Sequence, residues 1–203
     1  MVAPFVLTSR AVDKDAELVE QLRHGDEAAF VELVKHYQPS LLRLAESTVG
    51  SAAVAQEVTQ DTWLAVMRGI EKFEGRSSFK TWLFRIMLNR AHSAARRETR
   101  AGRASDSLDE RFDAGGAWAE PPEPWADRAE DRIVAVHLAE RVQVLLPELP
   151  TAQRQVVTLR DVEGLPATEV SSLLGLSEGN QRVLLHRGRA RLRALLTDEM
   201  SVL

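Results

Sequence analysis

The stretch from Gly164 to Arg193 constrains the fold most, because it has the pattern of two short helices joined by a tight turn. A first helix is predicted by apolar residues at i, i+3, i+4 spacing, namely Val170, Leu173 and Leu174. Gly175 follows them at the position where a left-handed C-terminal cap prefers glycine. Ser177 is a good N-cap for the second helix. The sequence therefore predicts a helix–turn–helix.

The second of these helices is basic on its outer surface. It has no acidic residue between its arginines, which are Arg182, Arg187, Arg189, Arg191 and Arg193. Its inner face is predicted to hold Leu185, Leu192 and Leu196 together with Gln181 and Gly188. Most basic runs are only the solvated face of a helical hairpin. Here the turn residues, the apolar spacing and the one-sided charge agree, which favours insertion into a DNA major groove.

Composition limits the class of protein. Apolar residues recur at helical spacing and strand-like runs are absent, so the fold class is all-α. The 203 residues suffice for one large or two small domains. The lack of cysteine excludes disulfides and thiolate metal sites and agrees with a cytoplasmic location. We expect no signal peptide and no membrane insertion, because no long apolar run is present. A net charge of −4 is unusual for a DNA-binding protein that acts alone.

The first half of the chain predicts a bundle of helices. Residues 1–12 are expected to be a flexible tail, and a short helix is expected from Asp15 to Arg23. Asp26 is a candidate N-cap for the next helix, and Pro39 is expected to start a new one. After a break at glycine and serine, a long helix is expected over residues 52–72, with apolar residues spread widely around it.

A loop over residues 73–79 separates this helix from the next, with Ser77 or Ser78 as the N-cap. The following helix, over residues 79–97, carries a stripe of aromatic, basic and amide residues, namely Trp82, Arg85, Asn89, His92 and Arg96. Stacking surface beside basic side chains suits single-stranded nucleic acid. For Trp82, burial in the core is an equally good interpretation.

Residues 99–130 have no sustained period and are rich in glycine, proline, alanine and acidic side chains, so they predict an irregular linker. The linker contains Trp118 and Trp125, which a simple tether seldom needs. We expect it to lie along a partner or to fold back. The helical period then resumes over residues 131–203.

Three segments in this order resemble the extracytoplasmic-function (ECF) group of bacterial RNA polymerase sigma factors. They are residues 57–63, residues 73–83, and the stretch from residue 149 through the helix–turn–helix with its arginine tail. The resemblance covers nearly the whole chain. It implies two small helical domains joined by the linker: a sigma region 2 bundle over residues 13–98, and a sigma region 4 helix–turn–helix over residues 131–203.

The resemblance also implies which residues bind which partner. Core polymerase would be bound by Glu57, Gln60 and Asp61. The minus-10 element, melted and with a base flipped out of the duplex, would be bound by Gly75, Arg76, Ser77, Ser78, Lys80, Trp82, Arg85, Asn89 and Arg90. The minus-35 element would be bound by Ser177, Glu178, Asn180, Gln181, Arg182 and Arg187. The linker would follow the RNA exit path.

Some positions depart from the family pattern. Glu57 stands where aspartate is commoner, and Pro166 stands where a capping serine is usual. In the recognition helix, Gln181 falls where a packed valine is expected, and Val183 and Leu184 fall where serine and arginine are usual. These changes leave the minus-35 contact set open at Leu184.

The implied function is promoter-specific transcription initiation, of a stress or envelope-response regulon. The implied partners are core RNA polymerase, promoter DNA as duplex and as melted non-template strand, and a separate anti-sigma factor. The alternative is a stand-alone helix–turn–helix regulator, which would be a symmetric dimer with a ligand pocket. An enzyme is not expected, because the five histidines form no metal-ligand spacing and no phosphate loop or nucleophile motif is present. No cofactor, catalytic residue or metal is predicted.

Overall fold

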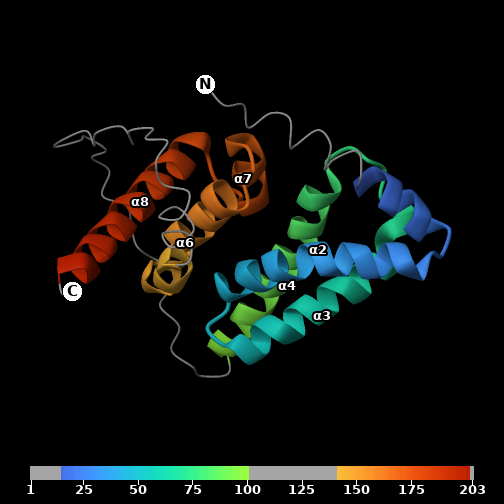
Figure 1. The fold of residues 1–203 in the computed structure, drawn as a ribbon, viewed down its shortest axis with the longest axis horizontal. Helices are drawn as coiled ribbons and strands as arrows, with labels where there is room; N and C mark the ends of the chain where they lie inside the picture. The colour runs from blue at the N-terminus through green and yellow to red at the C-terminus, as the bar shows by residue number, and fades with distance from the viewer. Residues whose placement is uncertain (1–14, 101–140, 202–203) are drawn as a thin grey trace.

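The computed structural model describes residues 15–100 and 141–201, and all regular elements within these ranges are helical (Figure 1). The predicted all-α class is therefore confirmed. No helix in the described ranges is long and apolar enough to cross a membrane. The predicted tail, and the predicted linker from residue 101 onward with both of its tryptophans, lie outside the described residues.

The N-terminal half is a bundle in which α2, α3 and α4 pack against one another. A helical segment over residues 15–23 leads into it. The main elements are α2 (Glu27–Glu46), α3 (Ala52–Gly69), the short 3₁₀ turn η1 (Ile70–Lys72) and α4 (Phe79–Arg100). The predicted breaks before α3 and before α4 are both present, so local turn and capping residues set these boundaries.

Asp26 begins α2 as predicted, because its Oδ1 atom accepts from the backbone N–H of Ala28 at 2.8 Å and of Ala29 at 3.3 Å. The predicted new start at Pro39 is wrong, since α2 continues through it to Glu46. A proline inside a helix removes one backbone donor. Here the packing of Tyr37, Leu41 and Leu44, all buried on either side of it, keeps the helix continuous.

The C-terminal half is built from shorter elements. They are η2 (Leu146–Glu148), α6 (Thr151–Val157), η3 (Thr158–Val162), α7 (Ala167–Leu174) and α8 (Glu178–Ser201). Within the helical period predicted over residues 131–203, residues 151–162 divide into an α-helix and a π-helical turn. The helix–turn–helix is confirmed: Gly175 is left-handed with φ 66°, and the Asn180 N–H donates to Ser177 Oγ at 3.2 Å.

The two halves are not independent bodies. One core, built mainly from α2, α3 and α4, also contains Leu159, Leu165 and Val170 of the C-terminal half. The remaining C-terminal apolar residues form a second core between α6 and α8. Because α7 packs on α4 and η3 packs on α2, the halves share a seam, which we call the interdomain seam.

Candidate polymerase and nucleic-acid interfaces

The three residues predicted to bind polymerase share one exposed face of α3. Glu57, Gln60 and Asp61 follow helical spacing and all are exposed. The opposite face of α3 is buried, with Val58 and Trp63 in the core. The packing of α3 in the bundle therefore fixes which side of the helix is presented to a partner.

Two apolar side chains extend this face and were missed as binding residues. Leu64 is 54% exposed and Met67 is 48% exposed, which makes them two of the most exposed large apolar residues described. They follow Gln60 and Asp61 by one and two helical turns. Apolar residues occur on all sides of α3, so the sequence pattern could not separate these two exposed residues from the buried ones. Together with the polar three they form what we call the α3 face.

In the loop before α4, some of the residues predicted to bind DNA are exposed, and one instead stabilises the fold. Gly75 has φ 70°, a conformation that favours glycine. Arg76 and Ser77 are exposed, and Arg76 Nε lies 3.1 Å from Glu74 Oε2. Ser78 instead caps α4, because its Oγ atom accepts from the Thr81 N–H at 3.1 Å.

The basic residues on α4 do not point to one common surface. Lys80 and Arg85 contact the C-terminal half: the Lys80 Nζ atom lies 3.2 Å from Glu163 Oε2, and Arg85 Nη2 lies 3.0 Å from Ser172 Oγ. Arg90 reaches the other way, toward α3. The predicted minus-10 set is therefore divided between the interdomain seam and open surface, where Asn89 is exposed.

Trp82 is half-buried and belongs to an aromatic cluster. Its ring centroid lies 5.0 Å from that of Phe73 and 5.9 Å from that of Phe79. It also touches Gly69, where an added Cβ would lie 3.5 Å from the indole. Burial in the core accounts for most of the Trp82 side chain, and only its remaining exposed part is available to a base.

The start of α8 presents most of the predicted minus-35 residues. Ser177, Glu178, Arg182 and Arg187 are exposed, and Asn180 is half-buried. Arg182 Nη2 lies 3.9 Å from Glu178 Oε2, which is a loose surface pair. These side chains can therefore meet phosphates or base edges without a change in the helix.

Two positions on α8 face inward instead. Gln181 is 1% exposed and Leu184 is 5% exposed, and Leu184 belongs to the second core. Gln181 was predicted to contact DNA, and its burial contradicts a side-chain contact in this conformation. Its helical-wheel position beside Leu185 and Gly188 already indicated the inner face, as the structure confirms.

Charge around the recognition helix is partly neutralised within the chain. Arg189 makes a bidentate pair with Asp161, with its Nε and Nη2 atoms 2.9 Å and 2.6 Å from the two carboxylate oxygens. Hydrogen bonding to Asp161 raises the pKa of Arg189 above its usual value. Among the described residues no cluster of histidine and acidic side chains could hold a metal ion.

Comparison with known families agrees with this division into two halves. The family description Sigma-70 region 2 matches residues 33–101, and the description Sigma-70, region 4 matches residues 139–192. The ECF RNA polymerase sigma-E factor of Salmonella typhimurium is 32% identical over a 178-residue alignment that covers 86% of this chain and 90% of the relative. The RNA polymerase sigma-H factor of Pseudomonas aeruginosa is 32% identical over a 185-residue alignment that covers 87% of this chain and 91% of the relative.

Solved structures resemble the chain in fold. CnrH, solved in complex with the cytosolic domain of CnrY, has a TM-score of 0.58 and 27% identity, and the match covers 92% of this chain and 99% of CnrH. The sigma factor RpoE of Bartonella quintana, solved in complex with the anti-sigma factor NepR, also has a TM-score of 0.58. At 22% identity, over 83% of this chain and 96% of that one, its likeness shows the fold alone.

Proposed function

The chain belongs to the ECF group of sigma-70 factors, which direct transcription by core RNA polymerase, and from this premise we propose which of its surfaces meet polymerase and promoter DNA. The proposal has three parts: a polymerase surface on α3, a minus-10 surface on the loop before α4 and on α4 itself, and a minus-35 surface at the start of α8. The observation that carries it is the α3 face, whose acidic, amide and apolar residues are exposed and lie outside the core of the bundle.

Core polymerase binds the α3 face. Leu64 and Met67 supply apolar area at its centre, and Glu57, Gln60 and Asp61 supply polar contacts at its side. Interfaces of this kind combine an apolar centre with a polar rim. Acidic side chains at the rim also favour a basic surface on the partner, which speeds encounter.

The minus-10 strand binds the loop and the basic residues of α4, which lie on more than one side of the helix. Arg76 and Ser77 are exposed at the loop tip, directly before the helix that carries Lys80, Arg85, Asn89 and Arg90. Basic groups neutralise phosphates, and the exposed edge of Trp82 offers a stacking surface to a base that has left the duplex. Gly75 gives the loop its turn, and Ser78 acts here as a capping residue that positions the others.

The minus-35 element binds the first turns of α8, through Ser177, Glu178, Asn180, Arg182 and Arg187. Base edges in the major groove are read by the N-terminal residues of a recognition helix. We leave Gln181 out of this set, because its side chain is buried. Leu184 stands where the family usually has arginine. It is a core residue here, so this position is not part of the DNA contact set.

We propose four further features of the function. A separate anti-sigma protein binds the factor, as NepR binds RpoE, a sigma factor of similar fold. The chain itself makes and breaks no bond, and it acts in the cytoplasm on a stress or envelope-response regulon. Each of these is inferred from the family rather than from any contact in the described residues.

Run-off transcription with core polymerase on a library of genomic promoters tests the proposal. Wild-type protein should direct initiation from a small set of promoters that share spaced upstream elements, and core alone should not. Tight, sequence-specific binding to duplex by the lone protein, with no effect on polymerase, would instead favour the stand-alone regulator.

A further inference from the structure

The helical segment that leads into the N-terminal bundle is fixed at its start and along one face. Its apolar residues Leu18, Val19 and Leu22 are buried in the N-terminal core. At the beginning of the segment, the carboxylate of Asp15 accepts a hydrogen bond from the Tyr37 hydroxyl of α2. The segment is therefore a firm support for the side chain at its end.

Arg23 ends this segment and bridges two backbone carbonyl groups that lie 47 and 50 positions further along the chain. Its Nε atom donates to the Ile70 carbonyl at 3.4 Å, and its Nη2 atom donates to the Phe73 carbonyl. Its Nη1 atom pairs with Glu20, one helical turn earlier. A guanidinium presents its donors in a rigid, planar fork, so Arg23 holds the two carbonyls in a defined relative position.

The two carbonyls mark the point where the chain leaves α3 and enters the loop before α4. Ile70 begins η1, and Phe73 follows η1 with extended backbone at φ −74° and ψ 107°. The Phe73 ring packs against two aromatic rings of α4, with its centroid 5.0 Å from that of Trp82 and 6.1 Å from that of Phe79. Arg23 thus holds both the first residue of the loop and one side of the aromatic cluster.

Beyond Phe73 the loop has little support of its own. Residues 74–77 are exposed, and a Cβ added at Gly75 would meet nothing within 4 Å. A surface hollow of about 650 Å³ lies between the loop and the first helical segment. Because packing does not hold the middle of the loop, its direction depends on its two ends, which are fixed by Arg23 at Phe73 and by the cap that Ser78 makes on α4.

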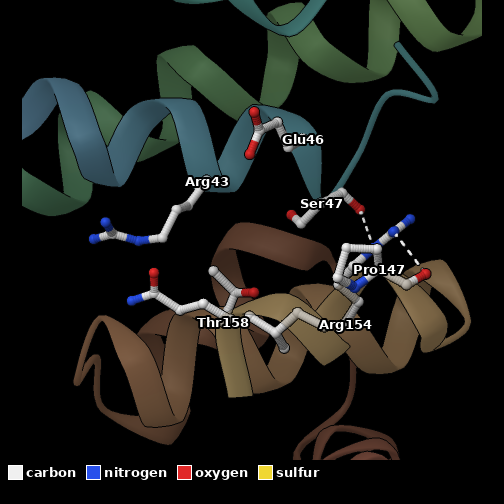
Figure 2. Close-up of a pocket in the computed structure, with 8 residues that line it drawn as sticks. Arg43, Glu46, Ser47, Pro147, Arg154 and Thr158 are labelled. Atoms are coloured by element: carbon white, nitrogen blue, oxygen red, sulfur yellow. Dashed lines mark hydrogen bonds between the residues drawn. The ribbon is translucent and has the colours of Figure 1, made fainter. Parts of the chain in front are cut away.

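A second arginine bridges two carbonyls in the same manner at the C-terminal end of α2 (Figure 2). Arg154 Nε donates to the Ser47 carbonyl at 3.2 Å, and Arg154 Nη1 donates to the Pro147 carbonyl at 3.2 Å. Neither carbonyl belongs to a residue that we propose to bind DNA or polymerase. Arg154 is therefore the matched comparison for Arg23, since it joins backbone segments away from the proposed binding surfaces.

We propose that Arg23 is a positioning residue for minus-10 recognition: it holds the Ile70 and Phe73 carbonyls so that the loop presents Arg76 and Ser77 to the melted strand. The proposal rests on the proposed function, which assigns the loop to that strand. The role of Arg23 is indirect, since its guanidinium is engaged with the two carbonyls and an acidic side chain. A loop held in its binding direction loses less conformational freedom when the strand binds.

Arg23→Ala tests the proposal in the full-length protein with core polymerase. Open-complex formation on a cognate promoter should fall on the order of tenfold, because two hydrogen bonds from a charged donor are lost. Affinity for core should not change. Permanganate reactivity of promoter thymines measures opening. Arg23→Lys keeps the charge but not the planar fork, so it should restore opening only in part. Full opening with Arg23→Lys would show that charge alone matters and would overturn the proposal.

Two control variants separate positioning from general stability. Glu20→Gln removes the ion pair but leaves both carbonyl contacts, so it should open the promoter like wild type. Arg154→Ala removes a bridge of the same kind elsewhere, so it should lower the unfolding midpoint without lowering thymine reactivity. If Arg154→Ala lowers reactivity as strongly as Arg23→Ala, lost stability explains the effect and the positioning role is refuted.

Hydrogen exchange in the isolated protein examines the loop directly. The Phe73 N–H donates to the Ile70 carbonyl at 3.1 Å, so this amide is protected while η1 is intact. A peptide over residues 70–79 should exchange faster in Arg23→Ala than in wild type or Arg154→Ala, and peptides from α2 should be unchanged in Arg23→Ala. Unchanged exchange over residues 70–79 in Arg23→Ala would contradict the proposal.

Combination with a loop variant shows whether Arg23 acts through the loop. Arg76→Ala with Ser77→Ala removes the proposed strand contacts, so adding Arg23→Ala should lower opening little further, because coupled residues are not additive. Losses that multiply would refute action through the loop. If the loop variant itself opens the promoter normally, the assignment of the loop in the proposed function fails. A loop variant that fails to open, together with normal opening in Arg23→Ala, refutes the positioning role alone.

Discussion

The Nη1 atom of Arg90 on α4 lies 3.8 Å from the Oδ2 atom of Asp61 on α3. A residue proposed to bind the minus-10 strand is thus paired with one proposed to bind polymerase. Both side chains are more than a third exposed, at 39% and 55%. Exposed pairs contribute only about 0–1 kcal/mol, so the pair can be exchanged for partner contacts with little loss.

The first prediction uses this pair. Asp61→Arg should abolish binding to core polymerase while leaving helicity and the unfolding midpoint close to wild type, because the pair that it removes is weak. At the interface the loss should be about 2–5 kcal/mol, the cost of removing one partner of a charge pair that becomes buried on binding. Affinity for core is measured with labelled protein. The control Arg90→Ala breaks the same pair but should retain core binding; equal losses in both variants would show that the α3 face is misassigned.

The second prediction concerns the loop tip. The double variant Arg76→Ala, Ser77→Ala should retain core binding but lower open-complex formation on a cognate promoter. The reason is that both side chains are exposed, so their loss removes contacts with the melted strand without affecting the bundle. Permanganate reactivity of promoter thymines measures opening. Lys72→Ala, an exposed basic residue just before the loop, is the control, and full reactivity in the double variant would exclude the loop.

The third prediction compares two glycines on α8. A Cβ added at Gly188 would lie 2.6 Å from Val157 Cγ2, whereas at Gly179 it would meet nothing within 4 Å. Gly188→Ala should therefore destabilise the chain by about 1–3 kcal/mol through overpacking. Gly179→Ala should stabilise it by about 0.4–1 kcal/mol, because alanine restricts the unfolded chain. Urea denaturation of the two full-length variants gives the comparison, and the same sign for both would contradict the packing of α8 on α6.

The fourth prediction concerns pH. Burial lowers the pKa of His92, with a further contribution from the charge of Arg96, and the His92 ring lies 3.3 Å from Gln155 across the interdomain seam. The neutral ring is therefore the stable form in the folded chain. Stability that depends on it is present above about pH 6.5 and is lost as the pH falls through the lowered pKa.

Denaturation midpoints should accordingly fall between about pH 7 and pH 5. The fall should be smaller in His92→Gln, which cannot gain the charge. His24→Gln, at an exposed histidine, should keep the wild-type slope. Parallel pH profiles for wild type and His92→Gln would show that this histidine does not report on the seam.

The fifth prediction concerns duplex DNA. Residues 131–203 hold equal numbers of basic and acidic side chains, and the whole chain has a net charge of −4. Non-specific affinity depends on neutralised phosphates, with a salt slope of about −0.9 per contact. The isolated protein should therefore bind promoter duplex weakly at physiological salt, and core polymerase should strengthen binding by holding both halves on one DNA. A band-shift titration with and without core measures the difference, and tight binding by the lone protein would argue against it.

Local signals in the sequence predicted much of the fold. Asp26, Gly75, Gly175 and Ser177 act through the backbone within a few residues, so their effects can be read without knowledge of the tertiary structure. The prediction of a new helix at Pro39 was wrong, because proline's local preference against a helix interior is outweighed by the packing of buried residues on both sides of it. Tertiary packing commonly overrides propensity in this way.

The candidate site was predicted less completely, for a physical reason. Lys80 and Glu163 are 83 positions apart, and no periodic pattern links them, so their contact depends on how the two halves pack. Gln181 is polar but buried, and only its place on the helical wheel indicated this. Leu64 and Met67 are apolar but exposed, so hydrophobicity alone could not identify them as binding residues.

The core shared by the two halves bears on how hybrid sigma factors can be built from halves of different relatives. Leu159, Leu165 and Val170 are buried against the N-terminal bundle, although they belong to the C-terminal half. A hybrid that joins this bundle to the helix–turn–helix of a relative inherits a foreign contact surface at those positions, even when each half folds correctly. Promoter specificity is therefore not transplanted by exchanging the recognition half alone; the residues that face the N-terminal bundle, Leu159, Leu165 and Val170 among them, must be matched to it as well.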